Sequence, residues 1–195
     1  MDTGCGPRTW LKNGVTAVAD HFSTRPGLSE TKMKAILAAF ETTGIRGVLT
    51  PSLVDQDFVR MISDKSSRSR LSQPAGGDRW QDQVLPVLHY VRKSSATSDL
   101  MLGPSSPFNC SDSLLREVVD MAERYDLGIH MHLLETRLQR WGAHKLYRDG
   151  VGTRLHKLGV LSRRLSAAHC VWLNEKEMDL MASSGASAVH NPASN

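Results

Sequence analysis

The segment 129–136, with the sequence IHMHLLET, contains the residues of this chain that are best suited to chemistry. If a strand ends near His132, the alternation of side chains directs His130 and His132 to the same face. Glu135 then lies in the following loop and can fold back over that end of the strand. A neutral imidazole beside a carboxylate suits metal-assisted activation of water, in which one group binds the metal and the other moves protons. The same pattern also fits two core histidines followed by a solvated glutamate.

Two further histidines follow short apolar runs that predict strands. His169 ends the run at 165–168, and His190 follows the run at 186–189. Each has a simpler interpretation. His169 also fits a hydrogen-bonded structural residue, and His190 also fits a turn between a strand and a loop.

The other ionisable residues favour structural or solvated positions. His21 follows a predicted strand, but we expect a structural role for it. The acidic pairs Asp55/Asp57 and Glu175/Glu177 are expected to be solvated, and the second pair suits the positive end of a helix dipole. Three histidines are expected on helices as surface or packing residues: His89, His144 and His156.

The three cysteines, Cys5, Cys110 and Cys170, are odd in number and widely spaced. This pattern argues against a disulfide framework and favours a reducing cytoplasm. A metal-independent hydrolase using Cys170 or His169 is a weak alternative. Nothing in the sequence pairs Cys170 with a base, and a small thiol in an apolar strand is usually inert packing.

The charge and hydropathy of the chain give no signal for a nucleic-acid partner, secretion or a membrane span. A net charge of +4 does not by itself argue for nucleic acid. The densest basic tract, Lys65, Arg68 and Arg70, has no aromatic platform and predicts a solvated loop. Residues 1–10 lack the apolar stretch of a secretory signal, and no apolar run approaches the roughly 18 residues of a membrane span. We therefore predict a cytoplasmic protein with no nucleic-acid or membrane partner.

Short apolar runs and amphipathic helices alternate about six times along the chain. The predicted strands are 14–19, 45–50, 100–103, 128–133, 165–168 and 186–189. The predicted helices are one through Met33 and Phe40 that Gly44 closes, 80–93 around Pro86, one capped by Ser111, 138–158 with a break near 150–152, and 175–183. A polar stretch at 63–78 predicts a loop.

This alternation predicts an α/β fold with parallel strands, which fits both a doubly wound sheet and a TIM-type barrel. A barrel places functional residues at the ends of many strands, whereas a doubly wound sheet gathers its site at one switch point. Polar residues recur here at strand ends, and the sequence contains neither a G-x-G-x-x-G motif nor a P-loop. The barrel is therefore favoured, with residues 1–195 as a single domain.

The chain resembles the amidohydrolase superfamily, above all the branch of S-adenosylhomocysteine/methylthioadenosine deaminase, guanine deaminase and the triazine hydrolases. The matching stretches are GVTAVADHF at 14–22, GIRGVL at 44–49, GPSSPFNCSDSLL at 103–115, GIHMHLLET at 128–136, LSAAHCVWL at 165–173 and GASAVHNPASN at 185–195. Their order and spacing cover nearly the whole chain. The resemblance implies a (β/α)8 barrel that hydrolyses C–N bonds, and in some members C–Cl bonds, of heterocycles.

The resemblance also implies roles for individual residues. His132 aligns with the fifth-strand ligand of a divalent metal, zinc or iron. Glu135 aligns with the carboxylate that carries a proton from the metal-bound water to a ring nitrogen. His169 aligns with the residue that orients this water, and His190 with Asn191 falls in the pocket after the seventh strand.

The sequence departs from the family pattern at three places. Neither the His-x-His pair of the first strand nor the metal-binding Asp of the eighth strand is present, so only His132 remains of four customary ligands. The substrate-contacting His of the Gly-Pro-His-Ser-Pro motif is Ser105 here, which leaves the identity of the substrate ring open.

We therefore expect a fragment of a metal-dependent hydrolase, a partial barrel of about six strand–helix units that is inactive by itself. Its substrate would be a purine- or triazine-like ring, and a homo-oligomer is compatible with the sequence. The alternative is a complete chain that acts as a non-catalytic binding or assembly module. Such a module would need a partner to cover its open sheet edges.

Overall fold

The structure is a computed structural model that describes residues 6–23, 28–63, 79–94 and 97–194. The chain forms two compact units. The first unit draws on Met1–Ser52 and Gly76–Met101, and the second on Leu53–Ala75 and Leu102–Asn195. In the described residues, no helix is both long and apolar enough to cross a membrane.

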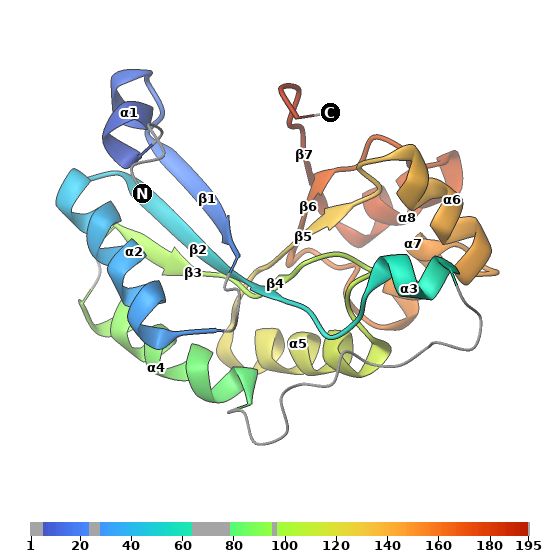
Figure 1. The fold of residues 1–195 in the computed structure, drawn as a ribbon, viewed down its shortest axis with the longest axis horizontal. Helices are drawn as coiled ribbons and strands as arrows, with labels where there is room; N and C mark the ends of the chain where they lie inside the picture. The colour runs from blue at the N-terminus through green and yellow to red at the C-terminus, as the bar shows by residue number, and fades with distance from the viewer. Residues whose placement is uncertain (1–5, 24–27, 64–78, 95–96, 195) are drawn as a thin grey trace. The chain divides into compact units, whose positions relative to one another are not determined.

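The first unit is a parallel sheet with helices packed along it. Its strands β1 (Ala17–Phe22), β2 (Arg46–Leu53) and β3 (Ser98–Leu100) pair in this order, although Leu53 at the end of β2 already belongs to the second unit. Helices α2 (Glu30–Thr43) and α4 (Trp80–Ser94) lie side by side on the sheet (Figure 1), and the short α1 (Pro7–Lys12) contacts α2.

Helix α2 shows how local sequence builds this unit. The hydroxyl of Ser29 caps its first turn, and Gly44 ends it in a left-handed conformation. Met33 and Phe40 are buried on the face toward the sheet. Gly47 on β2 is a glycine because a Cβ there would lie 2.1 Å from the ring of Phe40.

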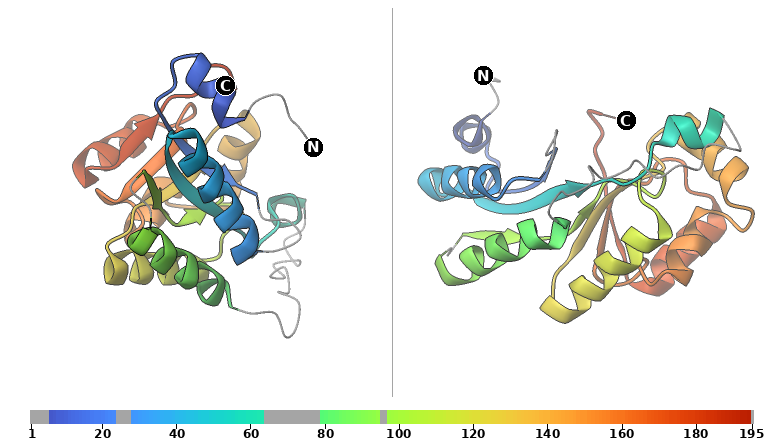
Figure 2. Two further views of the ribbon diagram at one scale, coloured as in Figure 1. Left: turned by 90° about the vertical axis from the view of Figure 1, so that its left-hand side faces the viewer. Right: turned by 60° about the horizontal axis from the view of Figure 1, so that its bottom comes forward.

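The second unit is also built on a parallel sheet. Strands β5 (Ile129–Leu133), β6 (Leu165–His169) and β7 (Ser187–Val189) pair in chain order. Helices α6 (Arg137–Leu146) and α7 (Val151–Lys157) connect β5 to β6, and α8 (Glu175–Ser184) connects β6 to β7 (Figures 1 and 2). The unit also contains α3 (Phe58–Ser63), β4 (Gly103–Pro104) and α5 (Asp112–Tyr125). Parallel strands joined by helices confirm the predicted fold class.

Helix α5 supplies much of the core of the second unit. The Ser111 hydroxyl accepts a hydrogen bond from the Leu114 main-chain N–H, as the cap prediction requires. The apolar face of α5 is buried at Leu114, Leu115, Val118, Met121 and Ala122, whereas Tyr125, expected on the same face, is only partly buried. Met131 and Ile129 of β5 are buried as well.

The strand predicted at 14–19 is displaced and is less buried than expected. It spans Ala17–Phe22 because Gly14 adopts a φ of 81° and closes α1, a helix that the sequence did not predict. Ala17 and Ala19 are exposed, because β1 is the outer strand of the described sheet. Helix α3 was also missed, because its six residues are too few for a helical periodicity to show.

Several predictions fall outside the described residues. These are most of the loop at 63–78, the basic tract of Lys65, Arg68 and Arg70, and Cys5.

Candidate active site

The carboxyl ends of β5 and β6 bring four predicted residues together. The ring centroids of His132 and His169 lie 5.3 Å apart, with an interplanar angle of 25°. Oε1 of Glu135 lies 3.6 Å from Nε2 of His169. Ser105, in the loop after β4, contacts His132 through its main chain. The pairing of Leu133 with His169 explains why the two strand ends meet.

The main-chain carbonyl of Ser105 fixes the orientation of His132. It accepts hydrogen bonds from the His132 main-chain N–H at 3.0 Å and from ring Nδ1 at 3.1 Å. A carbonyl oxygen can only accept, so Nδ1 carries the proton in this arrangement and the lone pair of the neutral ring lies on Nε2. Metal-binding histidines are commonly oriented by a hydrogen bond of this kind.

The ends of both strands are conformationally strained. Leu134, His169 and Cys170 have φ values of 47°, 73° and 57°, a region that costs a non-glycine residue about 1–2 kcal/mol. The Cys170 main-chain N–H donates to Leu133, and the Trp172 N–H donates to Leu134. These bonds join the two curled ends and hold His169 toward Glu135.

His130 is a buried structural residue of β5, two residues before His132. Its Nδ1 lies 3.1 Å from the hydroxyl of Ser166, and the ring is 7 % exposed. Burial, and then the charges of His132 and His169, lower the pKa of His130 to about 4. His130 therefore stays neutral near pH 7. It shares a face with His132, with ring centroids 6.2 Å apart, as the alternation predicted.

His190 and Asn191 follow β7, whose last pair in the register is Val189 with Ala168 of β6. His190 is exposed, and within the described residues its side chain makes no hydrogen bond or ring contact with His132, Glu135 or His169. The carbonyl of Asn191 accepts from the main-chain N–H of Ser194. His190 and Asn191 therefore follow the strand that pairs with β6, but within the described residues no hydrogen bond or ring contact joins them to His132, Glu135 or His169.

The described residues supply at most part of a metal centre. Nowhere among them do three His, Cys, Asp or Glu side chains come together in a way that could hold a metal ion. A catalytic zinc takes about three protein ligands. His132 alone has the orientation of a ligand, so the residues present do not fit a complete centre.

Cys110 and Cys170 lie in surroundings that disfavour the thiolate form a nucleophile needs. Burial raises the pKa of Cys170 to about 11 and that of Cys110 to about 12. A thiol with so high a pKa is almost entirely protonated near neutral pH. The metal-independent alternative based on Cys170 therefore loses support.

The sequence analysis did not predict the structural roles of two residues, Arg154 and Glu177. Arg154 of α7 donates to the carbonyls of Pro107 and Cys110, and so fastens the loop that carries Ser105. Glu177 was expected to be solvated, which is wrong, because it is buried and pairs with Arg140 of α6. The Asn174-x-x-Glu177 spacing of a capping box was the available signal.

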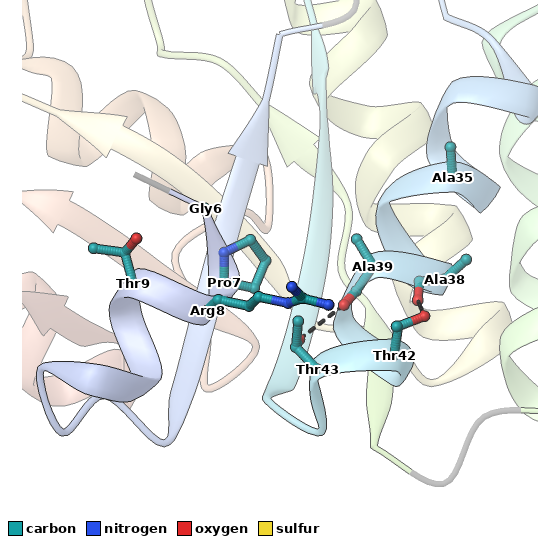
Figure 3. Close-up of a pocket in the computed structure, with 9 residues that line it drawn as sticks. All are labelled: Gly6, Pro7, Arg8, Thr9, Ala35, Ala38, Ala39, Thr42 and Thr43. Atoms are coloured by element: carbon teal, nitrogen blue, oxygen red, sulfur yellow. Dashed lines mark hydrogen bonds between the residues drawn. The ribbon is translucent and has the colours of Figure 1, made fainter. Parts of the chain in front are cut away.

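A pocket of about 630 Å³ lies elsewhere, between α1 and α2 of the first unit (Figure 3). None of the predicted site residues lines it. Its walls are mainly small side chains of α2, and the hydroxyls of Thr42 and Thr43 are bonded to carbonyls of their own helix. Arg8 is its one charged lining residue, so the pocket lacks a general acid, a general base or a nucleophile.

Comparisons with known proteins agree with this arrangement. A profile described as the amidohydrolase family matches residues 6–195. The chain is 28 % identical over 186 residues to the 5-methylthioadenosine/S-adenosylhomocysteine deaminase of Halothermothrix orenii, covering 95 % of this chain and 37 % of the relative. The chain thus spans little more than a third of that relative's length.

Solved structures share the fold. A zinc-bound adenosine deaminase from Xanthomonas campestris superposes with a TM-score of 0.72 at 20 % identity, covering 95 % of this chain and 37 % of that one. A triazine hydrolase from Arthrobacter aurescens superposes with a TM-score of 0.73 at 23 % identity, covering 95 % and 41 %.

Proposed function

Because the chain belongs to the amidohydrolase family, we propose that the protein hydrolyses a carbon–nitrogen bond of a purine- or triazine-like heterocycle. The overall reaction would replace a ring amine by oxygen from water and release ammonia. The observation that carries the proposal is the Glu135–His169 contact beside the oriented imidazole of His132. The deaminase and hydrolase names of the similar proteins support it.

Glu135 and His169 are proposed to handle the protons of this reaction. Glu135 is half-buried and faces His169, so its carboxylate can hold a proton and pass it to a ring nitrogen. The strained main chain at His169 holds the imidazole where it can orient a water molecule. We assign the substrate-binding roles to Ser105, His190 and Asn191.

A divalent metal, zinc or iron, is proposed as the cofactor of the whole protein. Bound metal in such enzymes acidifies water and polarises the substrate. His132 would be one ligand, through Nε2. The described residues do not fit a complete centre, so we propose that this stretch of chain does not catalyse the reaction by itself.

We propose the substrate only as a chemical class, a purine- or triazine-like ring. Ser105 has a small hydroxyl and not an imidazole, so other residues must supply more of the contacts that recognise the ring. We propose a cytoplasmic enzyme, and a homo-oligomer remains compatible with these features. We also propose that residues 1–195 form a single partial-barrel domain.

Ammonia release by the protein expressed from its complete gene tests the proposal. We expect metal-dependent release from 5-methylthioadenosine, guanine or an aminotriazine, and its loss in Glu135→Gln. A folded protein that binds no metal and releases no ammonia from any of the three would instead favour a non-catalytic binding or assembly module.

A further inference from the structure

In the ion pair between Arg140 on α6 and Glu177 on α8, Glu177 is buried and Arg140 is partly buried. Arg140 Nη1 donates to Glu177 Oε2 at 2.6 Å, and the Glu177 side chain is 4 % exposed. The same Oε2 accepts the main-chain N–H of Asn174 at 3.0 Å. One carboxylate oxygen therefore takes both hydrogen bonds.

The other oxygen of Glu177, Oε1, is buried, and no group in the described part of the chain donates a hydrogen bond to it. It faces the start of α7, where a Cβ on Gly152 would lie 2.8 Å from Glu177 Cγ. Leaving a buried polar group without a hydrogen-bond partner costs about 1–3 kcal/mol, against about 1 kcal/mol for a typical helix cap. Capping alone therefore does not explain why this carboxylate is buried.

The two helices that the pair joins both follow proposed catalytic residues. Helix α6 begins directly after Glu135, with Thr136 as its N-cap, and the Glu135 main-chain N–H donates to the Gln139 side chain at 2.7 Å. Helix α8 follows the segment 170–174, which starts directly after His169.

The pair adds a side-chain contact to two main-chain hydrogen bonds. The Cys170 N–H bonds to the Leu133 carbonyl at 2.9 Å and the Trp172 N–H bonds to the Leu134 carbonyl at 3.1 Å, and both join the segments that follow β5 and β6. The Arg140–Glu177 bond, in the first turns of α6 and α8, supplies a further attachment between the two helices.

We propose that Arg140 and Glu177 are positioning residues that set the separation between the Glu135 carboxylate and the His169 imidazole. The proposal rests on the proposed function, because these two groups must face the same substrate. It also explains why an ionic pair is kept where apolar residues of similar size often fold as well.

Two variants test the proposal. Arg140→Met removes the hydrogen bond and the charge on α6 but leaves the Glu177 cap of α8 in place. The double variant Arg140→Met/Glu177→Met replaces the pair with apolar side chains, a change that commonly leaves stability unaltered or raised. Arg164→Met is the matched control, because it removes an ion pair of 2.7 Å with Asp126 just before the opposite end of β6.

Two readouts are needed on the protein expressed from its complete gene. With 5-methylthioadenosine, guanine or an aminotriazine as substrate, we expect kcat to fall roughly 10- to 100-fold in both variants while KM changes less than about twofold. Hydrogen exchange followed by mass spectrometry should show faster exchange in peptides covering 133–137 and 169–173. Arg164→Met should leave both readouts unchanged.

Wild-type kcat and wild-type exchange in both variants would overturn the proposal. Failure of both variants to fold would also overturn it, because the pair would then serve the fold rather than the position of the site. If the wild-type protein releases no ammonia, the proposed function fails, and the exchange measurement alone decides the role of the pair.

Discussion

The two parallel sheets differ in where they place conformational strain. In the described residues of the first unit, every left-handed position is a glycine, Gly14 and Gly44. The second unit has glycines at such positions too, but Leu134, His169 and Cys170 adopt the same conformation with side chains. These three residues lie directly at the ends of β5 and β6.

The burial of the strands varies within each unit. Four of the five residues of β5 and four of the five of β6 are buried, whereas no residue of β7 is. Five of the eight residues of β2 are buried, whereas no residue of β1 is. Well-buried strands such as β5 and β6 can hold strained residues at their ends, because their packing offsets the cost. In the second unit, strained side chains therefore stand at the ends of two buried strands, whereas the left-handed positions in the described residues of the first unit are glycines.

The largest expected effect is on catalysis. In the protein from the complete gene, Glu135→Gln should lower kcat by roughly 10²- to 10⁴-fold, because it removes the proposed proton carrier. Asp20→Asn, within β1 of the first unit, should change kcat less than about threefold, because Asp20 is not among the residues proposed to handle protons. Steady-state ammonia release measures both, and equal losses would break the comparison.

A packing change should act on the first unit. Gly47→Ala should lower the free energy of unfolding by about 1–3 kcal/mol, because its Cβ would overlap the ring of Phe40. Urea denaturation gives the value. Gly6→Ala meets no atom within 4 Å and serves as the control, so an equal loss there would contradict the packing explanation.

Opposite responses are expected at left-handed positions. Gly44→Ala in the first unit should destabilise by about 1 kcal/mol, because φ is 73° there and the site is otherwise open. Cys170→Gly in the second should stabilise by about 0.5–1 kcal/mol through relief of strain. Cys170→Ala removes the thiol but keeps the strain, so a stabilisation equal to that of Cys170→Gly would argue against strain. Thermal unfolding distinguishes these cases.

The smallest expected effect is a dependence of folding stability on pH, and it arises from Cys110 in the second unit. The pKa of Cys110 is raised from 9.0 to about 12 in the folded state, so the unfolded chain loses the thiol proton first. Stability should therefore be complete below pH 9 and fall as pH rises toward 12, by less than about 1 kcal/mol between pH 8 and 9.5. Cys110→Ala should flatten this slope in urea titrations, and an unchanged slope would assign it to other groups.

The sequence predicted the elements that carry strong local signals. The cap at Ser111, the end of α2 at Gly44 and the strands before His132 and His169 all follow from short patterns. Glu177 could not be placed, because its burial depends on Arg140, which lies 37 residues earlier. The left-handed conformations at His169 and Cys170 were also invisible, since residue type there favours an ordinary strand end.

The hydrogen bonds from His132 end on a main-chain oxygen of residue 105, and every amino acid supplies that oxygen. The side chain at 105 is therefore separate from the task of orienting the imidazole. A substitution at this position changes the side chain but keeps the oxygen that orients His132.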